Sequence, residues 1–369
     1  MPEITDFLKK CLDDLEERID PLVEDELYTE WVDFNEGKYQ GDFFLPERAK
    51  KSPASFDWIQ QAADHFGGAT ARLKQIPVND TLESYEIMAL QQYHGASACL
   101  ETGNGFMMTI RSNYGTCIMP SLFGAELYIM PEETNTLPTN YPLGLDKIKE
   151  IVKNGVPDIN GGLSEKVFTM GEFFREINRN YPKISKYVHV MHPDTQGVID
   201  ISELLWGSEM LLAFYEQPQL VKDLFQVVSD TYIAFMEKWQ QIFPFNADYN
   251  AHWGFLHKGN IVYRSDSVMN ISPDMYEEFV FEHQKRILNH YTGVLHFCGR
   301  GDHYVKQLSN IDGLTAVNLS QPEYNDMENI YTETIDKGKH ILLLPAEEGK
   351  RAVDDGRDLR GLVHCFESF

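Results

Sequence analysis

Residues 260–319 read NIVYRSDSVMNISPDMYEEFVFEHQKRILNHYTGVLHFCGRGDHYVKQLSNIDGLTAVNL. Three short apolar runs lie in this stretch, Asn260 to Tyr263, Gly293 to Phe297 and Leu314 to Leu319, with amphipathic segments between them at 273–291 and 302–310. Short apolar runs are typical of buried strands, whereas apolar residues that recur every three or four positions indicate helices. Strands that alternate with helices pair in parallel. The stretch therefore predicts an α/β fold.

The same alternation extends from about residue 85 to the end of the chain. The other strand-like runs are Phe106 to Ile110, Val188 to Met191, Gly197 to Ile201, His340 to Leu344 and Gly361 to Phe366. The other helical stretches are 82–99, 144–154, 166–180, 202–214, 217–242 and 325–338. About eight strands with helices between them predict a (β/α)8 TIM barrel. An open doubly wound sheet is the alternative, but no Gly-x-Gly-x-x-Gly turn follows an early strand.

The N-terminal segment differs from the rest. Residues 4–30 carry apolar positions at helical spacing with a charged opposite face. We therefore expect extra N-terminal helices, and we divide the chain into a helical extension at 1–80, packed on the barrel, and the (β/α)8 barrel at 81–369.

Charge and cysteine usage restrict the partners and the compartment. Acidic residues outnumber basic ones by 57 to 32, which gives a formal net charge of −25. Such a field repels phosphate backbones and anionic headgroups, so we expect no nucleic-acid and no membrane partner. The five cysteines are scattered, which favours a reducing compartment. The first residues carry no basic flank followed by an apolar run, so we expect a cytoplasmic protein.

The strongest site candidate is the end of the run 293–297. His296 and Cys298 are two positions apart, so on a strand they point to the same side, and the active site of a barrel lies at the strand ends. Imidazole and thiolate are ligands that zinc prefers, and Cys365, at the end of the last run, supplies a third. The alternatives are a packed His and Cys inside the barrel and, for Cys365, an ordinary residue near the end of the chain.

A second candidate follows the run 106–110. Arg111 offers a planar fork for a carboxylate or phosphate, and Asn113 and Tyr114 offer orienting hydrogen bonds. The alternative is that Arg111 pairs with a structural carboxylate at the barrel rim. Asp266, after the run 260–263, is a candidate general acid or base, or a residue that orients a metal-bound histidine; the alternative is a simple turn residue.

Three more residues complete the set of candidates. His303 follows the run 293–297 and is a candidate for proton transfer, and Arg300 and His192 are candidates for substrate binding. For an isolated histidine, the alternative is a hydrogen-bonded, partly buried ring.

Several motifs between 190 and 320 resemble the uroporphyrinogen decarboxylase (URO-D) superfamily, which includes cobalamin-dependent methyltransferases. They are Gly197-Val198-Ile199-Asp200 leading into Leu204-Leu205-Trp206-Gly207, Tyr215-Glu216-Gln217-Pro218, Asp266 followed by the segment 271–279, and His296-x-Cys298-Gly299. The resemblance covers about half of the chain and implies a (β/α)8 barrel with a cleft at the strand ends.

Within this superfamily the chain is more similar to the methyltransferase branch. It has no Arg-Gln-Ala-Gly-Arg segment of the kind with which true decarboxylases bind propionates. The branch implies zinc held by His296, Cys298 and Cys365, a substrate thiol activated by that zinc, and a corrinoid methyl donor on a separate protein. Asp266, His303 and Arg111 would then be the catalytic residues. The sequence departs from the branch after Cys365, where Phe366 replaces the usual glycine and only four residues follow the cysteine.

Two other functions remain open at this point. One is a metal-independent decarboxylase or lyase that acts on a carboxylated or tetrapyrrole-like substrate, with Arg111 binding the carboxylate. The other is a non-catalytic protein that binds a corrinoid or a tetrapyrrole. The expected partners are a small-molecule substrate, a corrinoid protein and a second copy of the chain in a homodimer.

Overall fold

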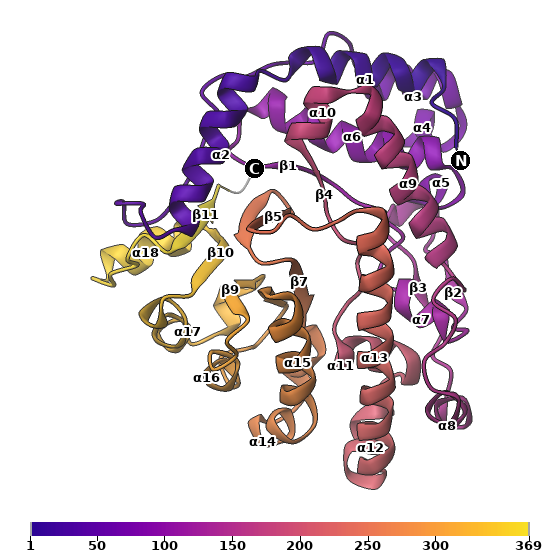
Figure 1. Ribbon diagram of the computed structural model, residues 1–369, viewed down its shortest axis with the longest axis vertical. Helices are drawn as coiled ribbons and strands as arrows, with labels where there is room; N and C mark the ends of the chain where they lie inside the picture. Colours follow the sequence, from indigo (N-terminus) through magenta and orange to yellow (C-terminus); the bar gives the residue numbers. More distant parts are fainter. Residues whose placement is uncertain (1, 368–369) are drawn as a thin grey trace.

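The computed structural model describes residues 2–367, and parallel strands at its centre are surrounded by helices (Figure 1). The strands are β1 (Met108–Ile110), β2 (Leu127–Tyr128), β3 (Thr139–Asn140), β4 (Val188–Val190), β5 (Tyr249–His252), β6 (Phe255–Lys258), β7 (Ile261–Arg264), β8 (Gly293–Phe297), β9 (Leu314–Leu319), β10 (His340–Pro345) and β11 (Val363–Phe366). The predicted α/β class is confirmed.

The helices alternate with these strands over most of the chain. They are α1 (Asp6–Arg18), α2 (Pro21–Asn35), α3 (Trp58–Phe66), α4 (Gly68–Leu73), α5 (Val78–Glu83), α6 (Tyr85–Thr102), α7 (Ile118–Leu122), α8 (Leu145–Asn154), α9 (Ser164–Asn180), α10 (Pro182–Tyr187), α11 (Val198–Trp206), α12 (Met210–Glu216), α13 (Pro218–Ile242), α14 (Pro273–Met275), α15 (Phe281–Tyr291), α16 (Val305–Leu308), α17 (Met327–Glu333) and α18 (Ala346–Asp354). A π-helical segment, Tyr276–Val280, joins α14 to α15.

The strands do not form one continuous eight-stranded ring within residues 2–367. Five strands make a parallel sheet in the order β11-β10-β9-β8-β7, and β1 and β4 form a separate parallel pair. The described residues thus form a five-stranded parallel sheet and a separate parallel pair, and the closure of the strands into the predicted (β/α)8 TIM barrel stays a prediction. In this sheet β7 and β8 are neighbours, with Arg264 opposite His296.

One predicted strand, 197–201, is a helix. It forms the start of α11, where the Gly197 N–H donates to Asp200 Oδ2 at 3.3 Å and so caps the helix. Val198, Ile199 and Ile201 are all fully buried. A short segment that is buried on every side has no amphipathic period, so its run of apolar residues is compatible with a strand and with a helix.

The inner face of the sheet is covered by α2 and by a hairpin of β5 and β6. One apolar cluster joins the inward side chains of four strands with those of α2 and the hairpin: Val262, Val294, Ala316, Leu342, Leu27, Trp31, Phe34, Ala251, Phe255 and Leu256. The alternate residues, among them Tyr263, Leu295 and Val317, belong to the larger core beneath the surrounding helices. This alternation follows from the two-residue period of a strand.

The turn of the hairpin consists of Trp253 and Gly254. Their φ angles are 44° and 86°, and two positive φ values in a two-residue loop are the signature of a type I′ turn. A side chain at Gly254 would come within 2.8 Å of Phe106 Cβ, so only glycine fits there. The hairpin was not predicted, and it carries Trp253 toward the functional site described below.

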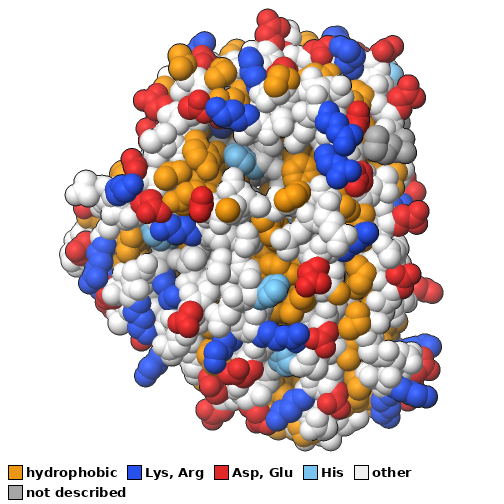
Figure 2. Space-filling model, in the orientation of Figure 1, with side chains coloured by type: hydrophobic (Ala, Val, Ile, Leu, Met, Phe, Trp, Pro, Cys, Tyr) orange, Lys and Arg blue, Asp and Glu red, His pale blue; other side chains and the backbone are white. Residues whose placement is uncertain are grey.

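The N-terminal helices contribute to the same core as the strands of the main sheet. Leu8, Leu12 and Leu15 of α1 are fully buried in the larger core, and Phe44 forms a parallel bridge with His364 of β11. The division at residue 80 stays a prediction. No helix in residues 2–367 is long and apolar enough to cross a membrane. On the face seen in Figure 2, apolar side chains gather in a band through the middle, and charged side chains of both signs surround it.

Candidate metal centre

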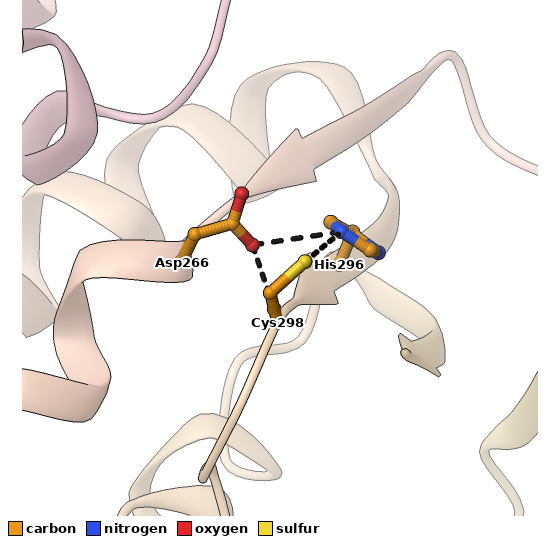
Figure 3. A group of neighbouring side chains, drawn as sticks. All are labelled: Asp266, His296 and Cys298. Atoms are coloured by element: carbon orange, nitrogen blue, oxygen red, sulfur yellow. Dashed lines mark hydrogen bonds and ion pairs between the residues drawn. The ribbon is translucent and has the colours of Figure 1, made fainter. Parts of the chain in front are cut away.

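Asp266, His296 and Cys298 converge at the ends of two neighbouring strands (Figure 3). His296 lies in β8 and Cys298 directly follows that strand, whereas Asp266 follows β7. One ligand atom from each residue lies within 4.8 Å of the others. The i, i+2 spacing places the imidazole and the thiol on the same side of β8, as predicted, and the parallel register brings Asp266 beside them.

Direct contacts hold this group together. The His296 Nε2 atom lies 3.4 Å from Cys298 Sγ and 3.5 Å from Asp266 Oδ1. Asp266 Oδ1 also accepts a hydrogen bond from the Cys298 backbone N–H at 2.7 Å. A nitrogen, a sulfur and an oxygen thus face a common point, and this donor set is one that zinc takes in proteins.

Asn318 in β9 fixes the tautomer of His296. The Asn318 amide nitrogen donates to the Leu342 carbonyl at 2.7 Å, so its Oδ1 faces His296 Nδ1, 2.5 Å away. The oxygen can only accept, so Nδ1 carries the proton and Nε2 presents a lone pair toward Cys298 and Asp266. A metal-binding histidine needs this arrangement.

The charges of the group favour a cation. Burial lowers the pKa of His296, so the imidazole is neutral at neutral pH and its Nε2 lone pair is free. Burial, and then the charge of Asp266, raise the pKa of the Cys298 thiol. A thiol in these surroundings keeps its proton at neutral pH unless a cation compensates for the charge of the thiolate.

Cys365 does not join this group. Its side chain is fully buried, and a Cβ atom on Gly349 of α18 would lie only 2.6 Å from its Sγ, so the sulfur packs against α18. Burial raises the pKa of this thiol to about 12. The next residue, Phe366, lines the cavity that contains His296. Among the described residues, the group that could hold a metal ion therefore contains Asp266 and not Cys365, because the side chains of β11 alternate and Cys365 is on the helix side. The zinc ligands expected from the sequence stay a prediction.

Arg111 and Asn113 are brought together in a buried ion network. Arg111 Nε donates to Asn113 Oδ1 at 2.9 Å, and Arg111 Nη1 lies 3.3 Å from Asp194 Oδ2. Arg264 donates to the other oxygen of Asp194, and Gln196 also donates to that oxygen. Burial lowers the pKa of Arg111 to about 10 and that of Arg264 to about 9. In this structure the fork of Arg111 is directed at a carboxylate of the protein itself.

Tyr114 and His192 also make their contacts with other groups of the protein. Tyr114 is buried in the larger apolar core. His192 Nδ1 donates to the Pro193 carbonyl at 2.7 Å, and its Nε2 accepts the Val262 N–H at 3.0 Å. Both ring nitrogens of His192 are thus occupied by the backbone, and their contacts join the segment after β4 to β7.

His303 and Arg300 lie on the loop after β8. The His303 Nε2 atom donates to the Ile271 carbonyl at 3.2 Å, and the Arg300 Nε atom donates to Asp302 Oδ1 at 2.7 Å. Neither residue is part of the group formed by Asp266, His296 and Cys298. Their catalytic and substrate-binding roles stay predictions.

Sequence reasoning missed Asn318, Asp194 and Arg264. Asn318 and Arg264 had a signal, because a lone polar residue inside or directly after an apolar run faces the interior of the sheet or lies at its end, whereas Asp194 is separated from its run by two residues. Asn318 interrupts the run 314–319, and Arg264 directly follows 260–263. The role of Trp253 depends on the hairpin turn, and the strands beside that turn, Tyr249–His252 and Phe255–Lys258, contain too many polar residues to form recognisable apolar runs.

No family model and no curated protein matches this chain. Among solved structures, the chain is similar to a methyltransferase from Methanosarcina mazei, with a TM-score of 0.59 and 15% sequence identity over 92% of each chain. At this identity the likeness concerns the fold. A methyltransferase is therefore among the proteins that share the arrangement of strands and helices described above.

Proposed function

We propose that this protein is a zinc-dependent methyltransferase of the URO-D type and that Asp266, His296 and Cys298 bind the zinc. The observation that carries the proposal is the Nε2 lone pair of His296, fixed by Asn318 and directed at a thiol and a carboxylate. The methyltransferase fold of the Methanosarcina mazei protein supports the reaction class.

Zinc bound by three protein groups keeps a position for a substrate thiol, whose pKa it lowers so that the thiolate is available at neutral pH. Around that position, protein groups hold the ligands in place. Asn318 holds the His296 ring, and Asp266 fixes the Cys298 backbone through the hydrogen bond to its N–H. We infer that the apolar side chains beneath the site keep water away from the sulfur.

The methyl donor in this proposal is a methyl-corrinoid carried by a separate protein. The acceptor sulfur forms a bond to the methyl carbon, and the carbon–cobalt bond breaks with its electron pair left on the corrinoid. The thiol proton goes to solvent. Asp266 acts here as a ligand rather than as the acid or base expected from the sequence. The remaining expectations, a small-molecule substrate, a homodimer and a cytoplasmic location, belong to the same proposal.

The zinc content of the purified protein tests the metal centre. We expect about one zinc per chain, held by three protein ligands with a fourth position open, and loss of the metal in Cys298→Ala and Asp266→Ala. Cys365→Ala is the matched control, because it removes a buried thiol that packs against α18, and it should keep the zinc. Wild-type protein that binds no zinc would contradict the proposal.

The loss of methyl groups from methylcobalamin in the presence of a thiol tests the reaction. The visible absorbance of the corrinoid should change with the zinc-loaded protein and not with Cys298→Ala. If a carboxylated substrate lost carbon dioxide equally well with wild type and Cys298→Ala, the metal-independent lyase would be favoured instead. Tight corrinoid binding without turnover would favour a binding protein.

A further inference from the structure

A cavity of about 320 Å³ lies directly beside the metal centre. It is lined by Trp253, His296, Asn318, Leu319, Ser320, Leu343, Pro345 and Phe366. His296 belongs both to this cavity and to the metal centre, so a molecule in the cavity lies next to the bound metal. The two sites are continuous.

Two polar side chains of the cavity, Asn318 and Ser320, have contacts within the protein. The Asn318 side chain bonds to His296 and to the Leu342 carbonyl, and Ser320 Oγ lies 3.6 Å from Cys298 Sγ. None of the lining residues is a lysine, an arginine, an aspartate or a glutamate. The lining therefore offers no side chain of opposite charge to an ionic group placed here, and a charge taken from water without such a partner is costly.

The guanidinium group of Arg264, close to the cavity residue Trp253, contacts other groups of the protein. Arg264 packs its guanidinium on the Trp253 ring, with Cζ 4.5 Å from the ring centroid, and donates to Asp194. The Trp253 ring also contacts the His296 ring, with centroids 5.0 Å apart. Arg264 does not line the cavity, whereas Trp253 does, so the surface offered there is aromatic rather than cationic.

Two walls of the cavity are held in left-handed backbone conformations. Leu343 has a φ of 55°, and the register between β10 and β11 shifts at this point of the strand. Its N–H donates to His364 Nδ1 at 3.2 Å, which holds the irregular segment in place. Trp253 has a φ of 44°. Bulges and left-handed residues of this kind re-aim side chains and are frequent beside functional sites.

We propose that this cavity is the acceptor subsite and that it takes the apolar organic group of the thiol, of about the size of a benzyl group. This inference rests on the proposed function. A volume of about 320 Å³ corresponds to about ten water molecules, which is enough for one small ring and its linker. Trp253, Leu343 and Phe366 contact the ring, and the sulfur points to Cys298 and His296.

Thiol binding to the zinc-loaded protein tests the subsite by calorimetry. Benzyl mercaptan should bind at least about tenfold more tightly than 2-mercaptoethanol, because the ring leaves water. Phe366→Ala should remove most of that preference and leave 2-mercaptoethanol binding unchanged. Tyr324→Ala is the matched control, since Tyr324 is an exposed aromatic residue outside the cavity, and it should keep the full preference.

A second measurement does not depend on zinc. Benzyl alcohol should quench the fluorescence of Trp253 in protein treated with a chelator, and the same titration of Trp253→Phe should show no such quenching. If the protein binds no zinc but benzyl alcohol still binds in the cavity, the subsite stands and the proposed function fails. If zinc binds but benzyl mercaptan and 2-mercaptoethanol bind equally well, or if 3-mercaptopropionate binds best, the subsite proposal is overturned and the metal centre stands.

Discussion

The hydrogen bond between His296 and Asn318 leads to a quantitative prediction. Asn318→Ala removes the acceptor of the Nδ1 proton, so the ring can adopt the other tautomer and rotate away from Cys298. The loss of such an orienting partner lowers metal affinity by about 10–100-fold. This factor corresponds to about 1.4–2.7 kcal/mol. The Leu342 carbonyl also loses its donor, which costs about 1–3 kcal/mol of folding stability.

Competition with a chromophoric chelator measures the zinc affinity, and urea unfolding in a chelator measures the stability of the metal-free protein. Asn318→Asp is the informative control, because it keeps an acceptor for His296 but cannot donate to Leu342. We expect this variant to lose stability and to keep most of its zinc affinity. An Asn318→Ala protein that binds zinc as tightly as wild type would refute the assignment of the tautomer and its role.

Three further predictions concern the cysteines and the buried charges. Cys298 in metal-free protein should react slowly with iodoacetamide at pH 7 and faster as the pH rises, because burial and Asp266 raise its pKa; Asp266→Asn should speed the reaction, and an unchanged rate by mass spectrometry would contradict this. Gly349→Ala should lower the free energy of unfolding by about 1–3 kcal/mol, and Cys365→Ala in the same chain should recover most of the loss in urea unfolding; equal losses in both proteins would argue against the contact. Asp194→Asn leaves two buried guanidinium groups without their carboxylate and should cost about 3–5 kcal/mol, whereas a loss below 1 kcal/mol would show that they are compensated elsewhere.

The strands of the main sheet could be predicted because both of their faces are buried. Gly293 to Phe297 was predicted as a strand, and β8 has the same bounds. Buried parallel strands form continuous apolar runs, which are easy to recognise. The prediction of a strand at 197–201 was wrong for the same reason, because a helix that is buried on all sides also forms a continuous apolar run. The hairpin at 249–258 has strands of only four residues each, which are too short to show a clear alternation of apolar and polar residues. The positive φ angles of its turn are a property of the folded backbone and could not be seen in the sequence.

Two of the three members of the candidate metal centre followed from local spacing. His296 and Cys298 share a strand, so their common direction needs no knowledge of the rest of the fold. The third member depends on long-range geometry. A shift of one residue in β11 would exchange the directions of Cys365 and Phe366, and the sequence of that strand does not fix its register. Asp266 reaches the group because β7 is the direct neighbour of β8.

The packing of α2 and the hairpin against the inner face of the sheet bears on how ligands reach the metal centre. Asp266 and Cys298 follow the carboxyl ends of β7 and β8, whereas apolar side chains of the sheet, α2 and the hairpin pack together on the inner face. Under the proposed function, the thiol and the methyl donor both reach the metal centre from the carboxyl ends of the strands, so we expect the smaller thiol to bind first.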